Sequence, residues 1–159
     1  MWKLLLLSTL FLTALTGSTT KIVNQQKVVE LHNKYRKKLK ISPLQFSQEC
    51  TNFAQQWAEN LAKKNRGITH STSNKYGENI YWSSSTSTES QMMNAWLSEK
   101  IYFNTRKRKS TFKNGHYTQI IWETTKFIGT GMATAEDGSE YWVCIYYPPG
   151  NWEGEKAYK

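Results

Sequence analysis

Apolar residues recur at helical spacing in three segments of the chain, which predicts three helices. The first covers residues 24–38 and has a heavily basic opposite face. The second follows Ser47, which is expected to cap it, and ends at Asn65. Its apolar stripe consists of Cys50, Phe53, Ala54, Trp57, Ala58, Leu61 and Ala62. The third helix follows a Ser/Thr-rich loop and carries Met92, Met93, Trp96, Leu97 and Lys100.

Alternating residues in the second half of the chain predict strands. The alternation runs over residues 116–122, 127–134 and 140–147, and Asp137-Gly138 is a strong turn signal between the last two runs. These two runs are therefore expected to form a hairpin. Helices first and antiparallel strands afterwards predict an α+β domain built in layers.

The first eighteen residues are set apart from this domain. Met1-Trp2-Lys3 is a short basic start, residues 4–15 are almost wholly apolar, and Thr16-Gly17-Ser18 supplies small residues for cleavage. This order is typical of a secretory signal peptide, with an uncleaved anchor as the alternative. We expect residues 1–18 to be a signal peptide, residues 19–159 to form a single domain, and the protein to be secreted and extracellular.

Composition and charge indicate which class of partner the protein would bind. The 159 residues suffice for one core, and 14% of them are aromatic, which compensates for few aliphatic residues because aromatic side chains bury large areas. The formal net charge is +9. Outside the cell, this charge favours an anionic membrane surface or a sulfated glycan as partner, and no nucleic acid is expected.

The two cysteines, Cys50 and Cys144, exclude a disulfide-dense scaffold. Both fit apolar patterns and are expected to be small core residues. A single bridge between them is the alternative.

Three histidines are the candidates for chemistry. His32 lies on the apolar side of the first predicted helix and is interpreted as a packing residue. His70 and His116, with Glu78 and Glu99, are residue types that hold zinc. Their spacing matches no metal-binding motif, so the spacing alone favours surface or core histidines. A Ser/His/Asp hydrolase is poorly supported, because the chain's only aspartate lies in the predicted hairpin turn.

Five motifs follow one another along the chain in an order typical of one family. The two long ones are GHYTQIIW with ETT after it, at residues 115–125, and YWVCIYYPPGNW, at residues 141–152. The shorter ones are His32-Asn33 with Arg36, Gly77-Glu78-Asn79-Ile80, and Trp96 with Glu99. Together they resemble the CAP superfamily, which groups cysteine-rich secretory proteins, insect-venom antigens and plant pathogenesis-related proteins. The similarity covers about residues 24–158.

This resemblance implies a fold and a site. The implied fold is an α+β, three-layer α-β-α sandwich with a central antiparallel sheet. The implied cleft is lined by His70, Glu78, Glu99 and His116, and its two histidines would bind Zn2+ weakly. The family recurrently binds sterols or other lipids and has no generally accepted catalytic activity. The implied function is a secreted, non-enzymatic lipid-binding protein acting in defence, venom or host interaction.

The chain also departs from the family. Cysteines expected around residues 105–115 and 130–136 are missing, so Cys144 lacks its usual partner, and the cysteine-rich C-terminal extension of some members is absent. In this respect the chain is similar to the Golgi-associated, disulfide-poor branch, with a signal peptide added.

A basic loop lies where the family has a variable loop over the cleft. It contains Arg106, Lys107, Arg108 and Lys109, and Phe103 and Phe112 flank it. Either these bases are simply solvated, or they contact anionic lipid or glycan while the aromatic residues enter the membrane. We expect the six residues to form the lipid contact.

Two alternative functions stay open. One is a metal-dependent, protease-like hydrolase in which zinc sits on the two histidines and a glutamate acts as general base. The other is a basic extracellular adhesion protein that binds anionic glycans or membranes through charge alone.

Overall fold

The computed structural model describes residues 21–159, so the predicted signal peptide at residues 1–18 lies outside the described residues. The helices are α1 (Gln25–Lys38), α2 (Gln48–Lys64), α3 (Glu89–Ser98) and α4 (Gly115–Ile120), and a short 3-10 helix, η1 (Glu99–Tyr102), continues α3. The strands are β1 (Gln45–Phe46), β2 (Gly77–Ser83), β3 (Phe127–Thr134) and β4 (Glu140–Tyr147). Over the described range, none of the helices combines the length and the apolar character needed to span a membrane.

Each of the three predicted helices begins at a side chain that caps it. Asn24, Ser47 and Thr88 each accept a hydrogen bond from the backbone N–H three residues later. Gln91 accepts the backbone N–H of Thr88 in return and completes a capping box. At its other end, α2 stops at Asn65, whose left-handed backbone turns its N–H back into the last helical turn. Local sequence thus sets where these helices start.

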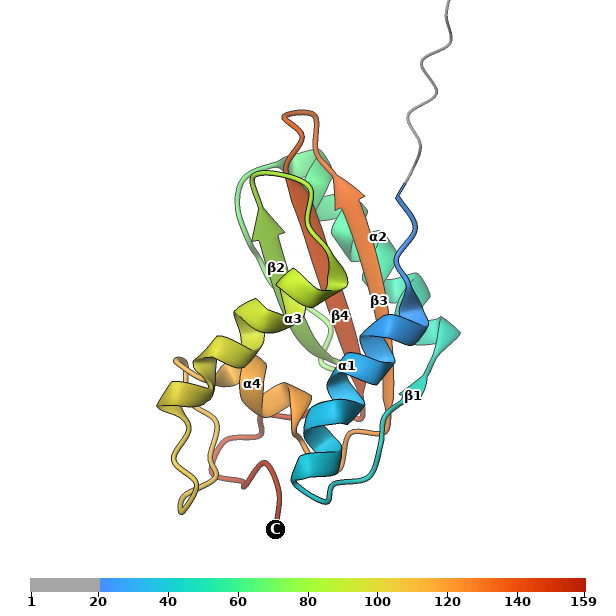
Figure 1. Cartoon of the computed structure of the whole chain (residues 1–159). Coiled ribbons are helices and arrows are strands. Elements are labelled where there is room, and N and C mark those ends of the chain that lie inside the picture. The colour runs from blue at the N-terminus through green and yellow to red at the C-terminus, as the bar shows by residue number, and fades with distance from the viewer. Residues whose placement is uncertain (1–20) are drawn as a thin grey trace, which may run out of the picture.

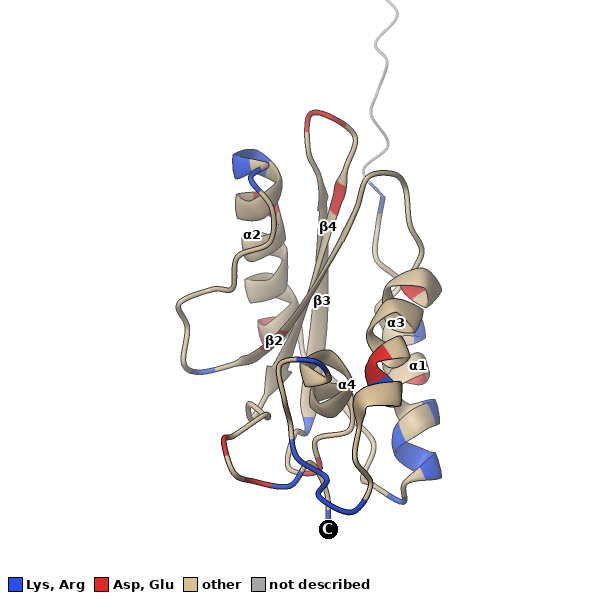
Figure 2. Ribbon diagram, turned by 90° about the vertical axis from the view of Figure 1, so that its left-hand side faces the viewer, with Lys and Arg blue, Asp and Glu red and all other residues tan. Residues whose placement is uncertain are grey.

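The four strands form one sheet in the order β1-β3-β4-β2. The predicted hairpin is confirmed as β3 and β4, which pair antiparallel, and β2 pairs antiparallel with β4. The two-residue β1 runs parallel to β3, so the sheet is mixed rather than purely antiparallel. Figure 2 shows the sheet edge-on, with α2 on one face and α1 and α3 on the other, and Figure 1 places α4 near the beginning of β2. The expected α+β layered sandwich is confirmed.

Glycines on β3 allow α2 to lie directly on the sheet. A Cβ atom at Gly129 or Gly131 would lie 2.2 or 2.3 Å from a backbone nitrogen of α2. The helix presents the small, fully buried Ala54 and Ala58 to the same core. A larger residue at either glycine would push helix and sheet apart.

The other face of the sheet carries the aromatic core. Trp96, Trp122 and Trp142 are buried there together with Met92 and Met93. These large side chains supply the apolar area that the few aliphatic residues of the chain do not.

Two polar side chains of α1 also enter this core. His32 is fully buried, with Nδ1 2.8 Å from the carbonyl oxygen of Val28 and Nε2 2.8 Å from the hydroxyl of Tyr146. Burial lowers the pKa of His32 to about 4, so the ring is neutral near pH 7. The prediction of a packing residue is confirmed. Arg36 is buried as well and donates to five backbone carbonyls, those of Ser42, Ile120, Trp122, Glu123 and Thr125.

The strand predicted at residues 116–122 is wrong: this segment is the helix α4 and the turn after it. Its alternation arises because Thr118 and Gln119 are buried beside apolar neighbours. The hydroxyl of Thr118 bonds the carbonyl oxygen of Asn114 and the side chain of Asn151, and the amide oxygen of Gln119 accepts the N–H of Gly150. Tertiary contacts of polar side chains therefore override the local strand preference.

Both cysteines are free and buried, so the possible bridge between Cys50 and Cys144 does not form. Cys50 lies on the buried face of α2, whereas Cys144 lies in β4 with its sulfur 2.9 Å from the hydroxyl of Thr130. Burial raises the pKa of Cys144 to about 12. The thiols are core residues, as the apolar patterns predict.

Candidate functional site

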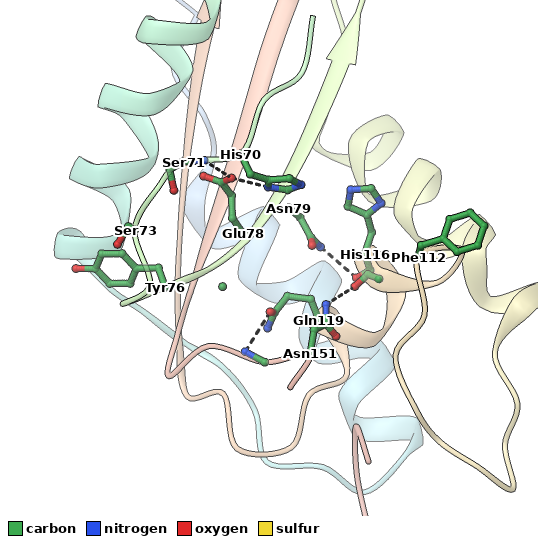
Figure 3. A pocket seen from close by; sticks show the side chains of 13 residues that line it. His70, Ser71, Ser73, Tyr76, Glu78, Asn79, Phe112, His116, Gln119 and Asn151 are labelled. Atoms are coloured by element: carbon green, nitrogen blue, oxygen red, sulfur yellow. Dashed lines mark hydrogen bonds and ion pairs between the residues drawn. The ribbon is translucent and has the colours of Figure 1, made fainter. Parts of the chain in front are cut away.

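A pocket of about 360 Å³ lies where the first residues of β2 meet α4 (Figure 3). Its lining is mostly polar and comes from three separate segments of the chain. The lining residues are His70, Ser71, Ser73, Tyr76, Gly77, Glu78, Asn79, Phe112, Gly115, His116, Gln119, Gly150 and Asn151. The pocket therefore contains three of the four predicted cleft residues.

His70 and Glu78 form one pair across the pocket wall. Nδ1 of His70 lies 2.6 Å from Oε1 of Glu78, and the backbone N–H of Ser71 donates to the same oxygen at 3.0 Å. This hydrogen bond raises the pKa of His70 above its ordinary value. The other carboxylate oxygen of Glu78, Oε2, is buried and has no hydrogen-bond partner within residues 21–159.

His116 and Glu99 form the second pair. Nδ1 of His116 lies 2.6 Å from Oε1 of Glu99, and the first backbone N–H groups of α4, at His116 and Tyr117, donate to Oε2. The imidazole also stacks on Trp96, with ring centroids 6.0 Å apart and planes 15° apart. Glu99 lies behind His116 and does not line the pocket. It holds the imidazole in place from outside.

A chain of hydrogen bonds ties the site to the core. Nδ2 of Asn79 donates to the carbonyl oxygen of His116 and to the hydroxyl of Tyr146, both at 3.1 Å. Because Nδ1 of His32 faces a carbonyl, it carries the proton, and its Nε2 accepts from Tyr146. Val28, His32, Tyr146, Asn79 and His116 are thus linked in one series. The sequence motif that contains Asn79 carries the signal for this role, but the spacing of residues alone does not reveal it.

Gln119 forms the floor of the pocket. Its amide oxygen accepts the backbone N–H of Gly150 at 3.2 Å, and its Nε2 lies 3.4 Å from the hydroxyl of Thr125. A Cβ atom at Gly77 would lie 2.3 Å from the Gln119 amide oxygen, so a larger residue at the first position of β2 would displace this amide. Gln119 and Asn79 are pocket residues that the sequence-based candidate set lacks.

The geometry of the pocket would allow the imidazoles of His70 and His116 to act as metal ligands. Each Nδ1 is engaged by a carboxylate, while neither Nε2 has a hydrogen-bond partner in the described part of the chain, and the two rings face one another in Figure 3. A carboxylate on the second nitrogen is the usual support of a metal-binding histidine. Among residues 21–159, however, no group of three or more His, Cys, Asp or Glu side chains is arranged to hold a metal ion.

The two phenylalanines that were predicted to contact lipid differ in their exposure to solvent. Phe112 is 93% exposed and lies on the rim of the pocket. Phe103 is half-buried and packs edge-on against Tyr117, with ring centroids 5.2 Å apart, and beside Tyr158. Tyr102, one position earlier, is exposed instead.

The four bases of the basic loop also differ in their surroundings. Arg106, Lys107 and Lys109 are exposed. Arg108 instead lies 4.9 Å over the ring of Tyr158, and its carbonyl accepts the N–H of Ala157. Three of the four bases are therefore available to a partner, and the fourth attaches the loop to the C-terminal segment.

Comparisons with known proteins show what this chain is similar to. Human Golgi-associated plant pathogenesis-related protein 1 is 36% identical over 128 residues, covering 79% of this chain and 82% of its own. Pathogenesis-related protein 1 of Arabidopsis thaliana is 31% identical, covering 84% and 81%. The crystal structure of NaASP2 with Zn2+ has a TM-score of 0.72 at 25% identity and covers 84% of both chains. The cysteine-rich secretory protein family, CAP, matches residues 29–146, and the chain belongs to this family.

Proposed function

We propose that this protein is a secreted, non-enzymatic lipid-binding CAP protein that docks on anionic membranes through the loop beside its His/Glu pocket. A role in defence or host interaction is part of the proposal, supported by the names of its pathogenesis-related relatives. The observation that carries the proposal is the exposed Phe112, which stands on the pocket rim close in sequence to exposed bases.

An exposed aromatic side chain next to positive charge suits a membrane surface. Phe112 and Tyr102 are 93% and 55% exposed, although large apolar side chains are normally buried. Lys113 Nζ lies 5.7 Å over the Phe112 ring and 5.8 Å over that of Tyr102, so charge and apolar surface are adjacent. Insertion of the rings among lipid chains and attraction of the bases to headgroups would then act together.

We also propose that the pocket binds Zn2+ weakly. His70 and His116 supply two imidazole nitrogens, and Glu78 and Glu99 orient the rings from Nδ1. Two protein donors are few for a structural zinc site, so folding would not depend on the metal. Bound Zn2+ would supply a Lewis acid to an anionic or hydroxyl-bearing ligand in the pocket.

The carboxylates do not favour hydrolysis. Both oxygens of Glu99 accept hydrogen bonds, from the ring of His116 and from two backbone N–H groups. Oε1 of Glu78 accepts two more, and its Oε2 is buried. Neither glutamate is placed to take a proton from water in the pocket, which a general base must do.

A charge-neutralised loop tests the membrane contact. In the loop variant, Arg106→Gln, Lys107→Gln and Lys109→Gln remove three exposed charges and leave Arg108 on Tyr158. Each base near an anionic surface contributes up to about 1 kcal/mol, so affinity for phosphatidylserine vesicles should fall by up to about a hundredfold, with a flatter salt dependence. Sterol binding in detergent should persist.

A matched α2 variant serves as the control. Lys63→Gln, Lys64→Gln and Arg66→Gln remove the same charge from exposed positions at the C-terminal end of α2. This variant should keep vesicle binding. Equal losses in the two variants would show that only net charge matters and would contradict a specific loop contact.

A further inference from the structure

The C-terminal end of α1 carries a second basic surface, away from the pocket. No acidic residue occurs between Glu30 and Glu49, whereas five bases do. Arg36 is buried, and the other four are exposed. We call these four the α1 lysine cluster: Lys34, Lys37, Lys38 and Lys40. Figure 2 shows this run of positive charge along the lower end of α1.

The helix geometry presents the cluster as one surface. Val28, His32 and Arg36 are the buried residues of α1, so the opposite side of the helix faces solvent. Lys34 is one turn away from both Lys37 and Lys38 on this side, at spacings of three and four residues. Lys38 Nζ lies 5.2 Å over the ring of Tyr35, which keeps it against the helix.

Lys40 occupies an unusual backbone position. Its φ is 59°, in the left-handed region, directly after the residue that caps α1, where glycine is the common choice. A non-glycine side chain costs roughly 1 kcal/mol in this conformation. The N–H of Lys40 bonds the carbonyl of Lys37, so the strained turn holds the lysine beside the others.

The cluster also lacks acidic partners. No salt bridge within residues 21–159 involves any of its four lysines. The carboxylate of Glu30 accepts from Gln26, and that of Glu123 accepts the backbone N–H of Lys159. The bases at the end of α2 form no salt bridge within this range either, but an acidic residue, Asp137 on the β3–β4 turn, accepts from their sequence neighbour Asn65.

The neighbours of the cluster distinguish it from the basic loop. The loop has Phe112 and Tyr102 nearby, whereas none of the exposed large apolar side chains in the described chain lies on α1. A surface with charge and no apolar anchor suits a hydrated polyanion better than a membrane. Lysine ammonium groups on flexible stems also suit sulfate groups spaced along a chain.

We propose that the α1 lysine cluster binds a linear sulfated polysaccharide, at a site separate from the lipid contact. The proposal rests on the secretion in the proposed function, since such polysaccharides are met outside the cell. Membrane binding by the loop and glycan binding by α1 are independent, so either can fail alone.

The test compares three variants that each remove three charges. The α1 variant carries Lys34→Gln, Lys37→Gln and Lys38→Gln, and the loop and α2 variants are those defined above. Binding to heparin is measured by titration calorimetry over a range of salt concentrations, with fully desulfated heparin as the reference ligand. The α1 variant should lose about tenfold in affinity, from three exposed ion pairs, and show a smaller salt slope. The loop and α2 variants should stay within about twofold.

Lys40→Gly gives a second test that does not depend on stability. Glycine fits the left-handed turn, so this variant should fold at least as stably as the parent protein. It should nevertheless bind heparin several-fold more weakly. Equal losses in all three triple variants, retention of full affinity in the α1 variant, or equal binding of desulfated heparin would each overturn the proposal. Loss of phosphatidylserine-vesicle binding in the α1 variant alone, with heparin binding intact, would assign the cluster to membranes instead.

Discussion

The amide of Asn79 and the backbone carbonyl of His116 are joined by a hydrogen bond of 3.1 Å, which connects β2 to the first turn of α4. The same amide group donates to Tyr146, whose hydroxyl in turn donates to His32. One side chain thus ties a buried core network to the position of a pocket imidazole.

Replacement of Asn79 should affect both stability and the site. Asn79→Ala leaves the His116 carbonyl and the Tyr146 hydroxyl without this donor, so unfolding free energy should fall by about 1–3 kcal/mol. Zinc affinity should fall as well, because His116 loses a restraint. Chemical denaturation and zinc titration measure the two effects. Asn52→Ala, on the exposed face of α2, should change neither.

The buried His32 should make stability depend on pH. Its pKa in the folded protein is about 4, below the value of about 6.5 expected in the unfolded chain. Between these values the unfolded state binds a proton that the folded state does not, so stability falls as pH decreases from 6.5 towards 4. At pH 5 the loss from this group is about 2 kcal/mol.

The pKa of His70 is raised by Glu78, so this residue acts in the opposite direction and gains stability as pH falls. Denaturation curves at pH 7 and pH 5 are therefore best compared in a His70→Gln background. There, His32→Gln should abolish most of the pH dependence between 4 and 6.5. An unchanged profile in the double variant would show that His32 is not the titrating group.

Lys21 should stabilise the fold by neutralising Glu140. This carboxylate is only 3% exposed and accepts from Lys21 Nζ at 3.2 Å, from the Ser87 N–H and from the Trp142 indole. Lys21→Ala should lower unfolding free energy by about 1–3 kcal/mol. The double variant with Glu140→Gln should recover part of the loss. If the losses of unfolding free energy from the two substitutions simply added in the double variant, the pairing of Lys21 with Glu140 would be contradicted.

Zinc binding should require both imidazoles. His70→Ala with His116→Ala should abolish binding of the metal in titration calorimetry, while the thermal transition shifts by only a few degrees. Glu78→Gln should weaken binding without abolishing it, because it alters only the support of His70. Unfolding of the parent protein by a chelator would contradict a weak, non-structural site.

The elements with strong local signals could be predicted from the sequence. The apolar stripe of α2 and the Asp137-Gly138 turn of the β3–β4 hairpin correspond directly to the structure. The helix α4 could not be predicted, because burial of Thr118 and Gln119 depends on partners more than thirty residues away along the chain, at Asn151 and Gly150.

The candidate site, like the fold, could be predicted from the sequence only in part. Four cleft residues followed from the family resemblance, but not that each histidine would pair with its own glutamate or that Glu99 would lie outside the pocket. From the sequence alone, Phe103 and Phe112 are equally good candidates for a lipid contact. Only the packing of Phe103 against Tyr117 separates a core residue from an exposed one.

The depth of residue 112 in a membrane tests the proposed lipid contact most directly. Because Cys50 and Cys144 are buried, a nitroxide attached to Phe112→Cys would label that position selectively. Ile68→Cys, at a position that is 51% exposed on a different loop, provides the control.

The measurement is electron paramagnetic resonance of both labelled proteins bound to phosphatidylserine vesicles, with oxygen and a water-soluble nickel chelate as relaxing agents. On binding, the label at 112 should become more accessible to oxygen and less accessible to nickel, while the label at 68 stays in water. A label at 112 that remains equally accessible to nickel, on protein that sediments with the vesicles, would contradict insertion of this loop.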